Sequence, residues 1–151
     1  MVRMDARMKH EHALGGVETG FTDLDTLCGG LHNSELIILA ARPSMGKTAF
    51  AMNIAEHVAI AIKQPVLFVS LEMVCLELAD RLLCSSAQVN GHRLRNGTIS
   101  QEDRRRLVQK SSEISSSPLY IDDTPGRTLT EIAAVARRLK RRNGLSLVVI
   151  D

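Results

Sequence analysis

The chain is poor in aromatic side chains, in paired cysteines and in long apolar runs. Phe, Trp and Tyr make up 3% of the 151 residues, and Trp is absent. We therefore expect an aliphatic core, and the scarcity of rings argues against a nucleic-acid platform built on base stacking. The apolar runs are five or six residues long at most. A bilayer-spanning helix needs roughly 20 such residues, so the sequence predicts no membrane segment.

Charge and cysteine use give the same picture of an ordinary soluble domain. The 19 basic and 17 acidic residues leave a net charge of +2, which is no global field toward a charged partner. Cys28, Cys75 and Cys84 form no CxxC pair, and we expect reduced thiols in a cytoplasmic protein. Residues 1–16 are polar, lack the apolar run of a signal peptide and end in two glycines. We expect them to be a flexible arm or the remnant of a linker.

From residue 17 onward, short apolar runs alternate with helical patterns. Four runs predict buried strands, over residues 36–40, 66–69, 118–121 and 145–150. Helices are predicted over 47–62 and 73–87, after Ser100 and after Thr128, with 88–99 as a loop. Asp103 and Glu131 stand three residues after Ser100 and Thr128, which is the spacing of helix capping. The alternation predicts an α/β fold around a mainly parallel sheet flanked by helices.

The segment 41–48 reads Ala-Arg-Pro-Ser-Met-Gly-Lys-Thr and fits the phosphate-loop pattern G-x-x-x-x-G-K-[ST] except at Ala41. It lies between a predicted strand and a predicted helix, where such a loop must lie. Loop N–H groups and the helix N-terminus hold phosphate oxygens. We expect Lys47 to reach the β- and γ-phosphates and Thr48 to give its hydroxyl to Mg²⁺. The residues assigned to nucleotide binding are Arg42, Pro43, Ser44, Met45, Gly46, Lys47, Thr48 and Ala49.

Two carboxylates follow predicted strands, Glu72 after 66–69 and Asp151 after 145–150. In a parallel sheet both point to the edge that carries the phosphate loop, where ligands bind. An aspartate after an apolar strand is the Walker B pattern, which directs a carboxylate to the Mg²⁺ shell, and a glutamate suits a base that activates water. We assign metal binding to Thr48 and Asp151, and catalysis to Glu72 and Lys47. Taken singly, either carboxylate could instead be an acid at a helix start.

Several further segments point to one family. They are the run Ser70-Leu71-Glu72-Met73, the end Val148-Val149-Ile150-Asp151, and the segments 16–25, 89–97 and 120–125. With them, the chain resembles the ATPase domain of the bacterial replicative DNA helicases, the DnaB family, over about residues 16–151. Phosphate loops of that family commonly carry Ala where other families carry Gly, so Ala41 fits the resemblance.

The resemblance implies a RecA-like phosphate-loop ATPase that takes part in DNA replication. It implies ATP and Mg²⁺ as ligands, with Lys47 and Thr48 on the phosphates and metal, Glu72 as catalytic base and Asp151 as Walker B aspartate. It also implies a ring-shaped homohexamer with ATP between subunits, an arginine finger supplied by the neighbour, and loops that grip single-stranded DNA. A primase or a loader is an implied partner.

The resemblance further indicates which parts of the family lie outside this chain. They are an N-terminal helical domain that meets primase and, after Asp151, the sensor glutamine, the DNA-gripping loops, the arginine finger and a strand between the Walker B and phosphate-loop strands. We therefore expect 17–151 to be the N-terminal part of the ATPase domain, incomplete at its C-terminus and without unwinding activity alone. Two alternatives stay open: another RecA-like ATPase of recombination or regulation, and a non-catalytic nucleotide-binding remnant that acts as an interaction protein.

Overall fold

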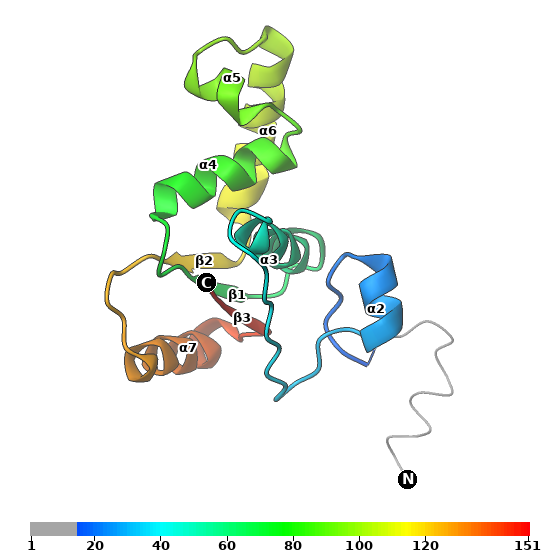
Figure 1. Cartoon of the computed structure of the whole chain (residues 1–151), viewed down its shortest axis with the longest axis vertical. Coiled ribbons are helices and arrows are strands. Elements are labelled where there is room, and N and C mark those ends of the chain that lie inside the picture. The colour runs from blue at the N-terminus through cyan, green and yellow to red at the C-terminus, as the bar shows by residue number, and fades with distance from the viewer. Residues whose placement is uncertain (1–14) are drawn as a thin grey trace.

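The computed structural model describes residues 15–151, and Figure 1 shows their arrangement. The elements in chain order are α2 (Thr22–Cys28), α3 (Lys47–Glu56), the π-helix η1 (His57–Ala61), β1 (Val66–Val69), α4 (Cys75–Ser86), α5 (Gly91–Arg95), α6 (Gln101–Ser116), β2 (Leu119–Asp122), α7 (Leu129–Asn143) and β3 (Leu147–Ile150). The arm expected over 1–16 lies outside the described residues except for its two glycines. Within residues 15–151, every helix is too short or too polar to cross a membrane.

Three parallel strands form the sheet in the order β2-β1-β3. The central strand β1 pairs Val66 with Leu119 on one side and with Leu147 on the other. All four of its residues are buried, because helices cover both faces of the sheet. The predicted α/β architecture with a parallel sheet is confirmed.

Alternate residues of β1 face two different helix layers, since successive side chains of a strand point to opposite faces. Val66 and Phe68 pack with Met52, Ala55 and Val58 from α3 and η1, and with Leu78 and Leu82 from α4. Leu67 and Val69 pack against Ile132 of α7 on the other face. Figure 1 shows α3 and α7 on opposite sides of the sheet. The helix predicted over 47–62 is therefore correctly placed, although its last turn is π-helical.

Helix α4 packs on the sheet, and from it α5 and part of α6 extend away, so that α4, α5 and α6 form a lobe whose tip is at the top of Figure 1. A small core of Ala87, Val89 and Leu107 holds it together. The sequence predicts a loop over 88–99, but this segment contains α5, whose first N–H groups are capped by the side chain of Asn90. Apolar periodicity does not reveal this short helix, because its stability comes from the cap and from contact with the small core.

Both predicted helix starts are confirmed. The Ser100 hydroxyl accepts from the N–H of Asp103, whose carboxylate accepts from the N–H of Ser100. Thr128 and Glu131 form the same reciprocal capping box at the start of α7. These caps are local in sequence, which is why the pattern alone locates them.

The segment before the phosphate loop folds around a buried carboxylate. Asp25 of α2 accepts hydrogen bonds from the N–H of Thr19 at 2.9 Å and from its hydroxyl at 2.8 Å. Val17 and Leu31 form an antiparallel bridge that closes the segment. The ring of Phe21 lies 4.7 Å from that of Phe50, between centroids, which attaches the segment to α3.

The strand predicted over 36–40 is not formed. Leu36, Ile37, Ile38 and Leu39 are 88%, 58%, 81% and 41% exposed, and no described residue pairs with them as a strand. An apolar run predicts burial, but a strand exists only where a neighbour supplies hydrogen-bond partners. Within residues 15–151, β3 is one of the two edge strands of the sheet and is not joined to this run. The prediction is wrong for this structure, although the phosphate loop still follows the run and precedes α3.

Candidate functional site

The loop 41–46 turns sharply into α3. Met45 donates its N–H to the carbonyl of Arg42 at 3.2 Å, and Ser44 and Gly46 have φ of 63° and 88°. Ala41 keeps a negative φ, so the methyl group in place of a glycine causes no strain. A Cβ built on Gly46 would meet no heavy atom within 4 Å, which leaves that side of the backbone open to a ligand.

The N-terminus of α3 carries free hydrogen-bond donors. No side chain caps it, and within residues 15–151 the backbone N–H groups of Gly46, Lys47, Thr48 and Ala49 have no acceptor. The next N–H group, that of Phe50, reaches the carbonyl of Gly46 at 2.9 Å. The positive end of the helix dipole adds to these donors. These donors and the partial positive charge suit an anion, and beside them the residues from Arg42 to Gly46 are exposed.

Asp151 connects the start of α3 to the end of β3. The Thr48 hydroxyl donates to its Oδ2 at 2.7 Å, and Lys47 Nζ lies 3.0 Å from its Oδ1. The Asp151 side chain is 3% exposed, so both carboxylate oxygens have partners where water is nearly excluded. Its N–H donates to Val69, and its carbonyl accepts from Leu71, which extends the sheet pairing by one residue on each strand. The carboxylate is therefore held by backbone and side chains alike.

Lys47 lies between the carboxylate predicted as catalytic base, Glu72, and the one predicted to bind metal, Asp151. Its Nζ is 3.6 Å from Glu72 Oε1 as well as 3.0 Å from Asp151 Oδ1. The hydrogen bond and the charge of Asp151, followed by the weaker effect of Glu72, raise the pKa of Lys47 above its usual 10.5. Lys47 is thus a full positive charge at neutral pH. The structure brings Lys47, Thr48, Glu72 and Asp151 together, as the sequence predicts, from α3 and the ends of β1 and β3.

Two further acids at the same sheet edge are not recognised as site residues from the sequence. Asp123 Oδ2 accepts the backbone N–H of Cys75, the first residue of α4, at 2.6 Å. Burial favours the neutral form of Asp122, but hydrogen bonds from Thr124 and the charge of Arg127 at 3.0 Å outweigh it and lower its pKa. The position of both acids after a predicted strand is the available signal, since that places them at the edge that carries Glu72.

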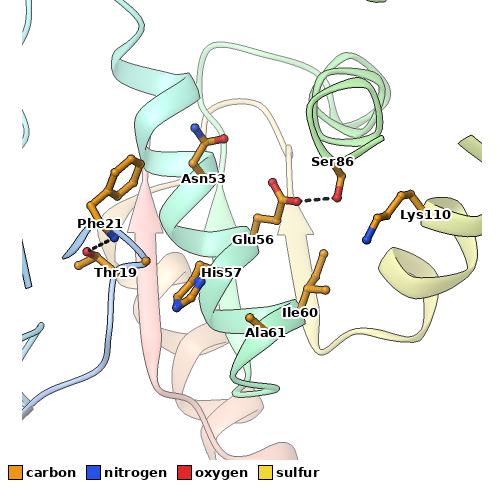
Figure 2. A pocket seen from close by; sticks show the side chains of 10 residues that line it. Thr19, Phe21, Asn53, Glu56, His57, Ile60, Ala61, Ser86 and Lys110 are labelled. Carbon is orange, nitrogen blue, oxygen red and sulfur yellow. Dashed lines mark hydrogen bonds between the residues drawn. The ribbon is translucent and has the colours of Figure 1, made fainter. Parts of the chain in front are cut away.

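A separate cavity of about 280 Å³ lies along the second half of α3 (Figure 2). Glu56 faces it and accepts a hydrogen bond from Ser86 of α4 at 2.6 Å. His57 and Lys110 also line it. None of the residues assigned to nucleotide, metal or catalysis lines this cavity, so it is distinct from the site at the start of α3.

A family model for the DnaB-like helicase C terminal domain matches residues 16–151. The chain belongs to this family. The replicative DNA helicase DnaC of Bacillus subtilis is 46% identical over 136 residues, which are 90% of this chain and 30% of that protein. The replicative DNA helicase DnaB of Leifsonia xyli is 44% identical over 148 residues, 98% of this chain and 32% of the relative. The chain thus spans about a third of the length of these relatives.

Solved structures give the same assignment. A DnaB-like replicative helicase, described with its interactions with primase, matches with a TM-score of 0.90 and 32% identity over 99% of this chain and 36% of its own. A second solved structure, described as an ATPase domain, matches with a TM-score of 0.91 and 32% identity over 99% of this chain and 54% of its own. The DnaB-family resemblance and its RecA-like fold are confirmed. These relatives favour this DnaB-like helicase domain over another RecA-like ATPase.

Proposed function

We propose that this DnaB-like chain is the ATP-binding part of a replicative DNA helicase that couples ATP hydrolysis to unwinding of duplex DNA. The observation that carries the proposal is the contact of Thr48 and Lys47 with the buried Asp151, beside the free N–H groups of α3. Family membership makes ATP the expected nucleotide. Residues 17–151 would then form the N-terminal part of the ATPase domain.

The donor set fits Mg²⁺, which prefers oxygen ligands from carboxylates and hydroxyls together with phosphate oxygens. The Thr48 hydroxyl and Asp151 Oδ2 lie 2.7 Å apart and offer such oxygens from two elements. When bound, Mg²⁺ supplies positive charge that neutralises the β- and γ-phosphates. Lys47 would turn from the carboxylates toward these phosphates, and the loop residues 42–49 would hold their oxygens through backbone N–H groups.

Glu72 is proposed as the general base. Its side chain is 65% exposed, and its one ion pair within the described residues is with Lys47. When Lys47 turns to a phosphate, the Glu72 carboxylate is left free to accept the proton of an attacking water. Lys47 would therefore pair either with the carboxylates or with a phosphate of the nucleotide. Its movement from one to the other would couple nucleotide binding to activation of the base.

The partners follow from the family and belong to the whole protein. We propose a homo-oligomeric ring, a hexamer, with ATP between subunits and single-stranded DNA held by segments outside residues 1–151. A primase or a loader is a proposed protein partner, in line with the primase interactions described for the structural relative. The cytoplasm is the proposed location.

The Glu72→Gln variant of the native protein separates binding from chemistry. The amide keeps the size of the side chain but accepts no proton, so Mg-ATP should still bind while turnover falls by ~10²–10⁴. Glu77→Gln is the matched control, because Glu77 is an exposed acid on α4 that pairs only with Arg81 among the described residues. If Glu72→Gln hydrolyses ATP within a few-fold of the native protein, the proposed base is wrong.

A further inference from the structure

Glu72 has little of its own that fixes its position. It lies on the loop 70–74 between β1 and α4, and its side chain is 65% exposed. The contact with Lys47 at 3.6 Å is its one ion pair within residues 15–151. The place of the Glu72 backbone therefore depends on how the two ends of the loop are held.

The first end of the loop is fixed by the sheet and by a local turn. Ser70 donates its N–H to the carbonyl of Asp122 at 2.9 Å, and Leu71 donates to that of Asp151 at 2.8 Å. The Ser70 hydroxyl, on a residue 2% exposed, donates to the Met73 carbonyl at 2.7 Å and accepts from the Met73 N–H at 3.1 Å. This half of the loop is held by strands on both sides of β1.

The second end of the loop depends on a side chain from elsewhere in the chain. The N-cap residue of α4, Val74, has no side chain that can cap the helix. The side chain of Asp123 caps α4 instead. Its Oδ2 accepts the N–H of Cys75 at 2.6 Å, although 48 residues separate the two. By contrast, α5, α6 and α7 are each capped by the side chain of their own N-cap residue. A carboxylate at this position also interacts favourably with the helix dipole.

We propose that Asp123 is a positioning residue for Glu72. It fixes the start of α4 to the end of β2, so the loop that carries Glu72 is held between the ends of β2 and β3. This inference rests on the proposed role of Glu72 as base. Asp123 itself touches neither nucleotide nor water in this account, and acts only through the place that it gives to the Glu72 carboxylate.

The Asp123→Ala variant of the native protein should reduce kcat for ATP hydrolysis by about 10- to 100-fold, since a displacement of about 1 Å has such effects. The Kd for Mg-ATP should stay within about two-fold, because the loop 41–46 and the start of α3 are untouched. An unchanged kcat in folded Asp123→Ala overturns the proposal.

The conservative variant Asp123→Asn keeps an oxygen acceptor for the Cys75 N–H and should retain most of kcat. Should Asp123→Ala fail to fold, Asp123→Leu, which keeps bulk at the position but has no acceptor for the Cys75 N–H, takes its place in the kcat measurement. Loss of kcat in a folded Asp123→Asn protein, equal to the loss in Glu72→Gln, would show that the cap is not what matters at this position and would overturn the proposal.

Ser100→Ala is the matched control, because it removes the cap of α6 and leaves the Glu72 loop alone. It should lower the melting temperature to a similar extent without changing kcat. A loss of kcat in Ser100→Ala equal to that in Asp123→Ala would mean that general destabilisation explains both, which overturns the proposal.

A double-mutant cycle separates this inference from the proposed function. In a Glu72→Gln background, Asp123→Ala should cause no further loss in single-turnover hydrolysis, because the group that it positions is already disabled. An equal further loss would show that Asp123 acts independently of Glu72 and would overturn the proposal while leaving the base assignment standing. If Glu72→Gln itself leaves turnover unchanged, the proposed function fails and this inference fails with it.

Discussion

The Thr48 hydroxyl donates a 2.7 Å hydrogen bond to Asp151 Oδ2 across 103 residues of sequence. The bond joins the first turn of α3 to the end of β3, and the side chain that accepts it is 3% exposed. A hydroxyl and a carboxylate meet here where a phosphate-bound cation would need oxygen ligands. The contact between the first turn of α3 and the end of β3 is thus also the proposed metal site.

We expect Thr48→Val to abolish most of the benefit that Mg²⁺ gives to nucleotide binding. Valine keeps the shape but has no hydroxyl, so the gain in ATP affinity on adding Mg²⁺ should shrink by about 10-fold or more. Titration calorimetry with and without EDTA measures that gain. Thr48→Ser is the control, because its hydroxyl should preserve the native response. An unchanged Mg²⁺ response in the valine variant would refute Thr48 as a metal ligand.

Gly20→Ala should destabilise the N-terminal segment. Gly20 has a φ of +84°, and a Cβ there would lie 2.6 Å from His57 Cγ. Gly97→Ala is a matched control at φ +68° with nothing within 4 Å of its Cβ, so it should cost about 1–2 kcal/mol from the backbone alone. Gly20→Ala adds the clash and should cost about 2–5 kcal/mol in denaturant unfolding. Most of the extra cost should disappear in Gly20→Ala/His57→Ala, because the two closest ring atoms are gone and only the Cβ contact at 3.0 Å is left. Persistence of the full extra cost would contradict the packing.

Local patterns predict local structure well in this chain. The strand 66–69 agrees with its prediction to the residue, since a continuous apolar run between turns is a property of the segment itself. The Ser100 and Thr128 caps are likewise located by residues three apart. The edge location of Glu72 and Asp151 follows from one topological rule, that the carboxyl ends of parallel strands meet.

What the sequence does not predict depends on contacts that form only in the folded chain. The buried contact of Thr19 with Asp25 forms only when the segment folds back on itself, and the cap of Cys75 by Asp123 joins residues 48 apart. The run 36–40 is not a strand for the same reason. A strand needs a neighbouring strand to accept and donate its hydrogen bonds, and the sequence of the run does not say whether one lies beside it. Hydrophobicity predicts that these residues seek burial, but not what buries them.

Acid should weaken the lobe through Asp103. Hydrogen bonds from Ser100 and the charge of Arg106 hold the pKa of Asp103 below its usual 3.8. The ionised Asp103 therefore stabilises the folded state fully at pH values above 3.8, its usual pKa and the one expected in the unfolded chain. This stabilisation is lost as the pH falls through the lower pKa that Asp103 has in the folded protein. The difference in free energy of unfolding between the native protein and Asp103→Asn should have its largest value near pH 6 and should shrink below about pH 4.

Denaturant unfolding across this pH range measures the difference. Glu102→Gln is the control, because Glu102 is the exposed neighbour and forms no ion pair within residues 15–151. A difference for Asp103→Asn that does not change with pH would contradict the assignment of the ionised carboxylate to this cap.

We expect residues 36–40 to become a strand when a further strand lies between them and β3. Leu36 and Ile38 of this run are 88% and 81% exposed. Val148 and Ile150 of the edge strand β3 are 39% and 50% exposed. Among the described residues, both apolar segments thus lack a further strand that would cover them. In the native protein, backbone amides 37–39 should therefore exchange slowly with deuterium. In a chain of residues 1–151 alone, they should exchange fast, and that chain should be marginally stable or aggregate.

The amide of Phe68 is the internal reference, since β1 is paired on both sides. It should be protected in the native protein and also in any folded fraction of the short chain. Fast exchange at 37–39 in the native protein would contradict the expected strand.

The central claim is that the loop 41–48 and the start of α3 hold the phosphates of ATP. Titration calorimetry of Mg-ATP into the native protein and into Lys47→Ala tests it most directly. Loss of a charged hydrogen bond worth ~1.5–3 kcal/mol should weaken binding roughly 10- to 100-fold. Lys140→Ala removes a lysine in the last turn of α7 and should leave the affinity unchanged. Equal affinity of Lys47→Ala and the native protein would contradict the account.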